Sequence, residues 1–287
     1  SLPINKKILS RFTISKNYTN GYIKNISDIN IPAYNTNSKN EFLFRSKILI
    51  KPNDLSDITL AGYYIDLDNK YDMWTPDNNG FITYSDYQGF DTQNSKALSL
   101  KINYKSNNNK FTYISSYLDN TALYSYDGDW ANDEFWSNPP YNWNSNNPYY
   151  GYWGPWSFKD STNRKRFTLS HEFRIKSNLK NNIVITSGLY FNNTKEIDNR
   201  NGWLFAGYAS NINSIFRIFN HAIYTQISIP INNNLFITTS IRLDNNNIEQ
   251  NLVYDEGLYN KIIKSKSLLG GSIKCFYKIN NNLIFNF

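Results

Sequence analysis

The chain has 287 residues, of which 40% are hydrophobic and 17% aromatic, and its formal net charge is +7. This length suits one large all-β domain or part of one. No apolar stretch reaches the about 18 residues of a membrane-spanning helix, and a single cysteine, Cys275, excludes an intrachain disulfide. The chain opens with Ser-Leu-Pro and shows no secretory leader, so we expect a processed protein or a fragment.

Alternating apolar and polar residues predict strands along most of the chain and little else. Most of the segments are about twice as long as the roughly 5 to 6 residues of a mean strand in soluble proteins. They suit the about 9 to 11 residues that a tilted strand needs to cross an outer membrane. In chain order, about eleven strands are predicted at 7–18, 42–51, 57–67, 96–106, 110–126, 166–176, 182–192, 215–229, 234–243, 267–279 and 282–287.

The predicted connections alternate between short turns and long loops. Short turns are expected at 52–56, 107–109, 177–181, 230–233 and 280–281. Long loops are expected at 19–41, 68–95, 127–165, 193–214 and 244–266. This alternation is typical of an up-and-down barrel, which has tight periplasmic turns and long extracellular loops.

The stretch TLSHEFRIKS and the residue before it show how side chains divide between two faces. One row holds Phe167, Leu169, His171, Phe173 and Ile175, and the other holds Ser170, Glu172, Arg174 and Lys176. A soluble antiparallel sheet with one wet face would alternate in the same way. The strand lengths and the alternation of short and long connections therefore predict an antiparallel up-and-down transmembrane β-barrel, with the apolar row facing lipid.

Three stretches, SHEFRIKS, NIVITSGLYF and AIYTQISIPINNNLFITTSIRLDNNN, resemble the central barrel of a TonB-dependent outer-membrane receptor. The residues that match the short motifs of this family are Ser170, Glu172, Arg174, Gly188, Leu189, Tyr190, Arg242 and Asp244. Phe191 and Leu243 stand where the family usually has tyrosine, and Ser240 stands where it often has glycine.

The resemblance implies a barrel of about 22 strands closed around an N-terminal plug. Residues 1–287 would then form one partial barrel domain of about eleven strands without the plug, and Phe287 would be a truncation point. A segment with two open edges should not form a stable pore alone, because each unpaired backbone group in lipid costs several kcal/mol.

The loop from Tyr126 to Trp156 is rich in aromatic and acidic residues. Its candidate ligand-binding residues are Asp127, Asp129, Trp130, Trp136, Trp143, Trp153 and Trp156. Aromatic faces beside polar groups can stack on sugars or flat organic ligands, and long loops commonly carry function. Alternatively, the aromatic residues form an interfacial girdle and pack the loop on itself. The segment DGDWANDE resembles a calcium loop but lacks the spacing of an EF-hand, so no metal site is predicted.

The polar row predicts residues that face the lumen or the plug, namely Ser170, Glu172, Arg174, Lys176 and Arg242. With other lysines and arginines they would make a mainly basic lining that attracts anionic metal chelates. Alternatively, Glu172 pairs with neighbouring arginines or helps to hold the plug.

No catalytic residue, cofactor or nucleic-acid partner is predicted, since His171 and His221 fall in the lipid-facing rows and no nucleotide-binding or zinc motif occurs. The resemblance implies a monomeric receptor in the outer membrane of a Gram-negative bacterium. It would import a scarce ligand, by default a ferric siderophore, with energy coupled through the protein TonB. Uptake of an oligosaccharide or cobalamin, a small passive porin, and a secreted glycan-binding β-protein are the alternatives.

Overall fold

The computed structural model describes residues 2–27, 34–71, 74, 76–77, 79–150, 157–204, 209–232, 234–255, 257, 259–280 and 283–286. Most of them lie in one 12-stranded sheet, whose neighbouring strands are antiparallel and follow one another along the chain. The strands of this sheet are β1 (Leu2–Asn5), β2 (Ile8–Thr19), β5 (Lys39–Asn53), β6 (Ser56–Tyr71), β8 (Gly89–Ser106), β9 (Asn109–Asp127), β10 (Lys159–Asn178), β11 (Val184–Leu204), β12 (Ala209–Pro230), β13 (Leu235–Tyr254), β14 (Tyr259–Asn280) and β15 (Leu283–Asn286).

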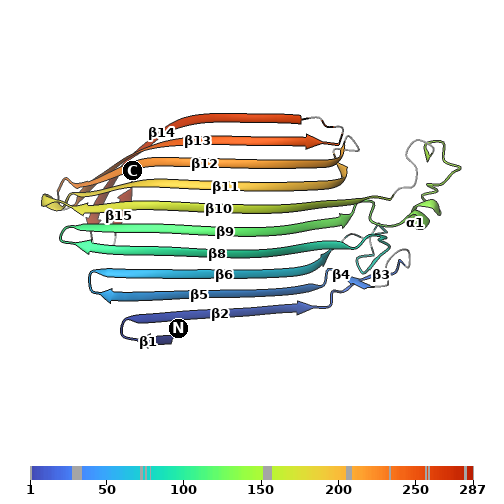
Figure 1. Ribbon diagram of the computed structural model, residues 1–287, viewed down its shortest axis with the longest axis horizontal. Coiled ribbons are helices and arrows are strands. Elements are labelled where there is room, and N and C mark those ends of the chain that lie inside the picture. Colours follow the sequence, from blue (N-terminus) through green and yellow to red (C-terminus); the bar gives the residue numbers. More distant parts are fainter. Residues whose placement is uncertain are drawn as a thin grey trace.

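Figure 1 shows the long strands side by side, with the tight turns at one end and the larger loops, including α1, at the other. The predicted fold class is confirmed, since each predicted strand is present in the large sheet, where only the short β1 was not foreseen. Within the described residues β1 and β15 form the two edges and do not pair with each other, so this sheet is open.

Asparagine residues build the tight turns. Asn107 and Asn181 adopt positive φ angles of 46° and 59°, which asparagine tolerates better than most residues. The Oδ1 atom of Asn232 accepts a hydrogen bond from the backbone N–H of Leu235 at 2.9 Å. The short turns predicted at 52–56, 107–109 and 177–181, and the described part of the one at 230–233, are therefore confirmed in place. The turn predicted at 280–281 includes residue 281, which lies outside the described residues.

Two of the predicted long loops are wrong. Residues 193–204 continue β11 and 209–214 begin β12, while 244–254 continue β13 and 259–266 begin β14. Asparagine and charged residues have low strand propensity, but here the backbone ladder continues across all four strands. The extended strands greatly exceed the about 9 to 11 residues needed to cross a membrane.

Three remaining loops meet at the same end of the large sheet. The first loop, between β2 and β5, contains β3 (Ile23–Asn25) and β4 (Tyr34–Thr36), and the second, between β6 and β8, contains β7 (Ile82–Thr83). These strands form a second sheet in the order β4-β3-β7. The third loop contains the short helix α1 (Asp133–Ser137), and a 3-10 turn, η1 (Lys180–Asn182), lies at the opposite end. In Figure 1 the elements β3, β4 and α1 lie beyond the ends of the long strands, at the right of the view.

The two faces of the large sheet differ in chemistry. On one face, Phe173, Ile223 and Ile241 are 50%, 56% and 50% exposed, and this surface is called the apolar face below. Among the described residues only four hydrophobic side chains are buried: Ile23, Ala131, Ile212 and Ala222. A soluble β-sandwich would bury one face against a second sheet, so the secreted sandwich alternative is not supported. No helix among the described residues is long and apolar enough to cross a membrane.

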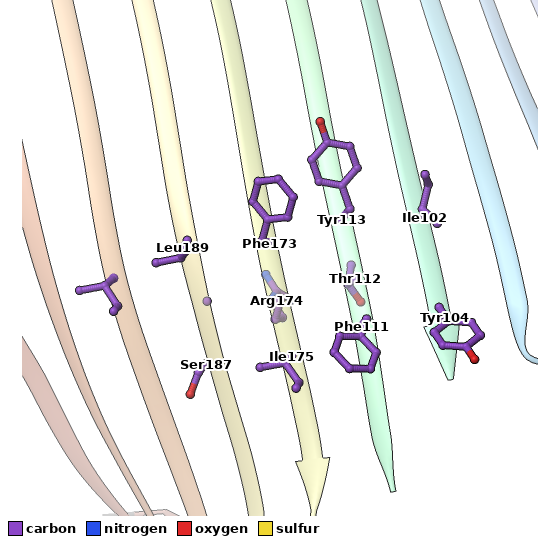
Figure 2. A pocket seen from close by; sticks show the side chains of 12 residues that line it. Ile102, Tyr104, Phe111, Thr112, Tyr113, Phe173, Arg174, Ile175, Ser187 and Leu189 are labelled. Atoms are coloured by element: carbon purple, nitrogen blue, oxygen red, sulfur yellow. The ribbon is translucent and has the colours of Figure 1, made fainter. Parts of the chain in front are cut away.

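A shallow groove of about 390 Å³ crosses the apolar face over β8 to β12. Figure 2 shows the rings of Phe111, Tyr113 and Phe173 along it, and the centroids of the last two rings lie 4.7 Å apart. His171 lies on this face, where its Nδ1 is 2.9 Å from the hydroxyl oxygen of Tyr113. The groove thus belongs to the surface predicted to face lipid.

Candidate ligand-binding site

A cavity of about 650 Å³ lies at the loop end of the sheet, between the end of β9 and the start of β10. Its walls are mainly aromatic, and none of its described lining residues is basic. The lining residues are Tyr126, Gly128, Asp129, Trp130, Trp136, Tyr141, Trp143, Phe158 and Asp160. Such a cavity can stack on planar or sugar rings and can accept hydrogen bonds through its carboxylates.

Gly128 allows the polypeptide to turn closely past the aromatic wall. A Cβ atom built on Gly128 would lie 2.2 Å from the ring of Phe158, so only glycine fits without displacing that ring. Two residues later Trp130 has a φ of 66°, an uncommon conformation for a bulky residue. Local backbone geometry therefore places Phe158 and Trp130 at the cavity.

Asn132 connects the tryptophan-containing loop to the two loops beside it. Its Oδ1 atom caps α1 by accepting a hydrogen bond from the N–H of Phe135 at 2.8 Å. Its Nδ2 atom donates to the carbonyl oxygen of Tyr84 at 2.9 Å and to Ser27 Oγ at 3.2 Å. One buried amide thus joins all three loops of this end.

Three buried aspartates lie together beside the cavity, and Asp86, Asp127 and Asp129 are called the acidic trio below. They are 7%, 0% and 1% exposed, and each offers an oxygen within 4.8 Å of the others. Asp129 Oδ2 accepts from Trp136 Nε1 at 3.1 Å, and its Oδ1 accepts from the N–H of Phe158 at 3.2 Å. Asp129 therefore belongs both to the trio and to the cavity wall.

Burial dominates the electrostatics of the acidic trio. Together with the hydrogen bond and charge of Asp129, it raises the pKa of Asp127 to about 9. It also raises the pKa of Asp129 to about 6 and lifts that of Asp86 above its ordinary value. Where no cation offsets the charge, burial thus favours the protonated, neutral form of these carboxyl groups.

The structure brings together part of the predicted loop site. Asp129, Trp130, Trp136 and Trp143 line the cavity, and the buried Asp127 lies close to Asp129. Trp153 and Trp156 lie outside the described residues.

Sequence reasoning missed Tyr126, Tyr141, Phe158, Asp160 and Asp86. Tyr126, Tyr141 and Phe158 lie in or beside the aromatic stretch and could have been chosen from its density of aromatic residues, whereas Asp160 is the second residue of β10 and carries no such signal. Asp86 comes from a different loop, after β7, and joins the site only through the packing of loops distant in sequence.

The polar face carries a hydrogen-bonded cluster centred on Tyr224. Arg174 Nη2 donates to Glu172 Oε1 at 2.7 Å, and Arg174 Nε donates to the Tyr224 hydroxyl oxygen at 3.1 Å. The Tyr224 hydroxyl in turn donates to Glu172 Oε1. Arg242 forms two hydrogen bonds of 2.8 Å with Asp244 and lies over the rings of Tyr190 and Tyr224.

The predicted basic lining is partly neutralised by acidic partners. Arg174 pairs with Glu172, Arg166 with Glu196, and Arg242 with Asp244. This arrangement agrees with the alternative in which Glu172 forms ion pairs with neighbouring arginines. Ser170 bonds Ser116 at 2.6 Å between hydroxyl oxygens, and Lys176 lies opposite Lys110 in the register of the sheet.

Four features together are those of the wall of an outer-membrane β-barrel. They are the long antiparallel strands, the exposed apolar face, the ion-paired polar face and the loops gathered at one end. Solved structures agree at the level of fold. The chain is similar to the ferric yersiniabactin uptake receptor of Yersinia pestis, with a TM-score of 0.71 and 13% identity over 97% of this chain and 41% of that chain. It is also similar to the siderophore receptor PiuA of Acinetobacter baumannii, with a TM-score of 0.66 and 11% identity over 96% and 44% of the two chains.

The open form of the ferric-catecholate import receptor of E. coli K12 gives a TM-score of 0.64 and 11% identity over 98% of this chain and 49% of that chain. No family model and no curated protein matches the sequence. The chain thus spans less than half the length of these three receptors, and its fold is that of part of the barrel of TonB-dependent outer-membrane receptors.

Proposed function

We propose that this chain is part of the barrel of a ligand-uptake receptor in the outer membrane of a Gram-negative bacterium. The aromatic cavity at the loop end of the sheet is the observation that carries the proposal. It lies where an outer-membrane barrel presents its long loops to the medium. Transport would be coupled through a plug domain to TonB, and the complete receptor would act as a monomer without enzymatic activity.

Ferric siderophores are the ligand class proposed first. The similar receptors named above carry siderophore or metal-chelate names, and the rings of Trp130, Trp143 and Tyr141 offer flat apolar surfaces to an aromatic chelator. Because the described lining includes Asp129 and Asp160 and no basic residue, a neutral or cationic chelate fits the cavity better than an anionic one.

An oligosaccharide is the second candidate ligand, and the same lining favours it. The aromatic rings are suited to stacking on sugar rings, and the carboxylates beside them can accept hydrogen bonds from the sugar hydroxyls. Cobalamin has no specific observation in its favour.

Replacing Trp130 and Trp143 with alanine in the full-length protein tests this function. A neutral ferric trihydroxamate, an anionic ferric catecholate for comparison and a maltooligosaccharide would be titrated in detergent, and uptake of radiolabelled iron would be followed in cells. At least one probe should bind the parent protein, and the double variant should bind it about 10- to 100-fold more weakly, because each lost stacking ring contributes about 1 kcal/mol or more.

Tyr149 supplies the matched control, since it lies in the same loop, is 64% exposed and does not line the cavity. Tyr149→Ala should leave affinity unchanged. If the double variant binds the probe as tightly as the parent, the aromatic residues serve only loop packing and the proposed binding site is wrong.

A further inference from the structure

The acidic trio serves more than the wall of the cavity. Asp86 and Asp127 are buried yet do not line it, and only Asp129 does. The trio is assembled from the loop before β8, the last residue of β9 and the loop after β9. Three ionised carboxylates from two segments of the chain, with oxygens within 4.8 Å of one another, would repel each other strongly in a buried setting.

The hydrogen-bond partners described for Asp86 and Asp129 are neutral donors. Asp127 Oδ1 accepts from the N–H groups of Asp129 and Trp130 at 3.3 Å each, and Asp86 Oδ2 accepts from Ser157 Oγ at 3.0 Å. Neither Asp86 nor Asp129 takes part in any ion pair found among the described residues. Neutral hydrogen bonds only partly offset the cost of removing carboxylates from water.

An independent feature is the second oxygen of Asp86. Asp86 is 7% exposed, and its Oδ1 atom is buried without any hydrogen-bond donor in the described parts of the chain. The Oδ1 atom of Asp133, the first residue of α1, is buried in the same state. Buried acceptors without a partner are rare in native proteins and call for an explanation such as a bound ion.

We infer that the acidic trio binds a divalent cation, and that this cation is calcium. All its donor atoms are carboxylate oxygens, which hard cations prefer, whereas zinc prefers histidine and cysteine. Calcium accepts 6 to 8 oxygen ligands in variable geometry, which suits donors gathered from separate loops. Oδ1 of Asp86 would coordinate the ion directly.

The bound calcium would organise the cavity, and this consequence rests on the proposed function. Asp129 connects the two features, because its Oδ2 accepts from Trp136 Nε1 and its Oδ1 accepts from the N–H of Phe158. Fixing Asp129 thus fixes two walls of the cavity before a ligand arrives. Ligand affinity should therefore depend on calcium, since preorganisation lowers the ordering cost of binding.

Calcium titration of the full-length protein in detergent, with no organic ligand added, tests the inference. Calorimetry should show a calcium site, and terbium bound in its place should luminesce when tryptophan is excited, since Trp136 bonds directly to Asp129. Asp86→Asn keeps the shape of the side chain but removes a charge. It should weaken calcium binding by at least about tenfold, because ligand charge tunes affinity in such sites.

Asp160→Asn is the matched control, since Asp160 lines the same cavity but lies outside the trio. The Asp160→Asn protein should bind calcium as tightly as the parent protein. Absence of calcium binding in the parent protein overturns the inference whatever the variants do. Equal binding by the parent and a folded Asp86→Asn protein also overturns it. Because no organic ligand is present, neither result bears on the proposed uptake function.

Discussion

At the scale of single residues, the candidate site is shaped by close packing between backbone and rings and by the hydrogen bonds of buried side chains. Gly128 leaves room for the ring of Phe158, and Asn132 joins three loops through one side chain. On the polar face Gly188 has a similar role, because a Cβ there would lie 2.4 Å from the Tyr224 ring. Tyr224 can therefore lie across β11 and reach Glu172 and Arg174.

Gly128→Ala should destabilise the loop and weaken ligand binding together. The added methyl group must displace Phe158, and such overpacking typically costs about 1–3 kcal/mol. Thermal unfolding in detergent should show a lower Tm than the parent protein, with weaker binding of the probe that the parent binds. Gly270→Ala is the control, since its Cβ would meet no atom within 4 Å; equal effects of the two substitutions would contradict this role of Gly128.

At the scale of elements, polar side-chain pairs accompany the strands far beyond the apolar belt. Arg164 Nε and Nη2 bond the carboxylate of Asp198 across β10 and β11 at 2.6 and 2.7 Å, and Arg217 bonds Glu249 across β12 and β13 at 3.1 Å. Such cross-strand pairs support a ladder whose residues have low strand propensity. They explain why segments predicted as loops are strands.

Asp198→Asn should loosen the loop end of β10 and β11. Asp198 is 6% exposed, and losing a charge-assisted hydrogen-bond pair of this kind costs about 1.5–3 kcal/mol. Hydrogen–deuterium exchange should become faster at 159–166 and 196–201 but stay unchanged near the tight turns. Asp68→Asn, which removes an exposed pair with Lys70, should have a far smaller effect; identical exchange in both variants would show that the buried pair does not hold the strands.

At the scale of the whole molecule, the fold was largely predictable and the site only partly so. Period-2 alternation located the strands and their two faces, because a barrel wall exposes one side to lipid and the other to water. The ends of β11 to β14 were not predictable, since neighbouring strands stabilise them. Asp86 was not predictable either, because its position beside Asp127 arises from loop packing that no local pattern records.

We expect the apolar face of this sheet to meet lipid and the polar face to meet water. Nitroxide labels at Ile241→Cys and Ser240→Cys, each in full-length protein with Cys275→Ser, test it most directly, because these adjacent residues of β13 lie on opposite faces. In reconstituted bilayers the label at 241 should collide more with dissolved oxygen, and the label at 240 should collide more with a water-soluble nickel complex. Equal accessibility to both reagents at the two positions would contradict the barrel-wall account.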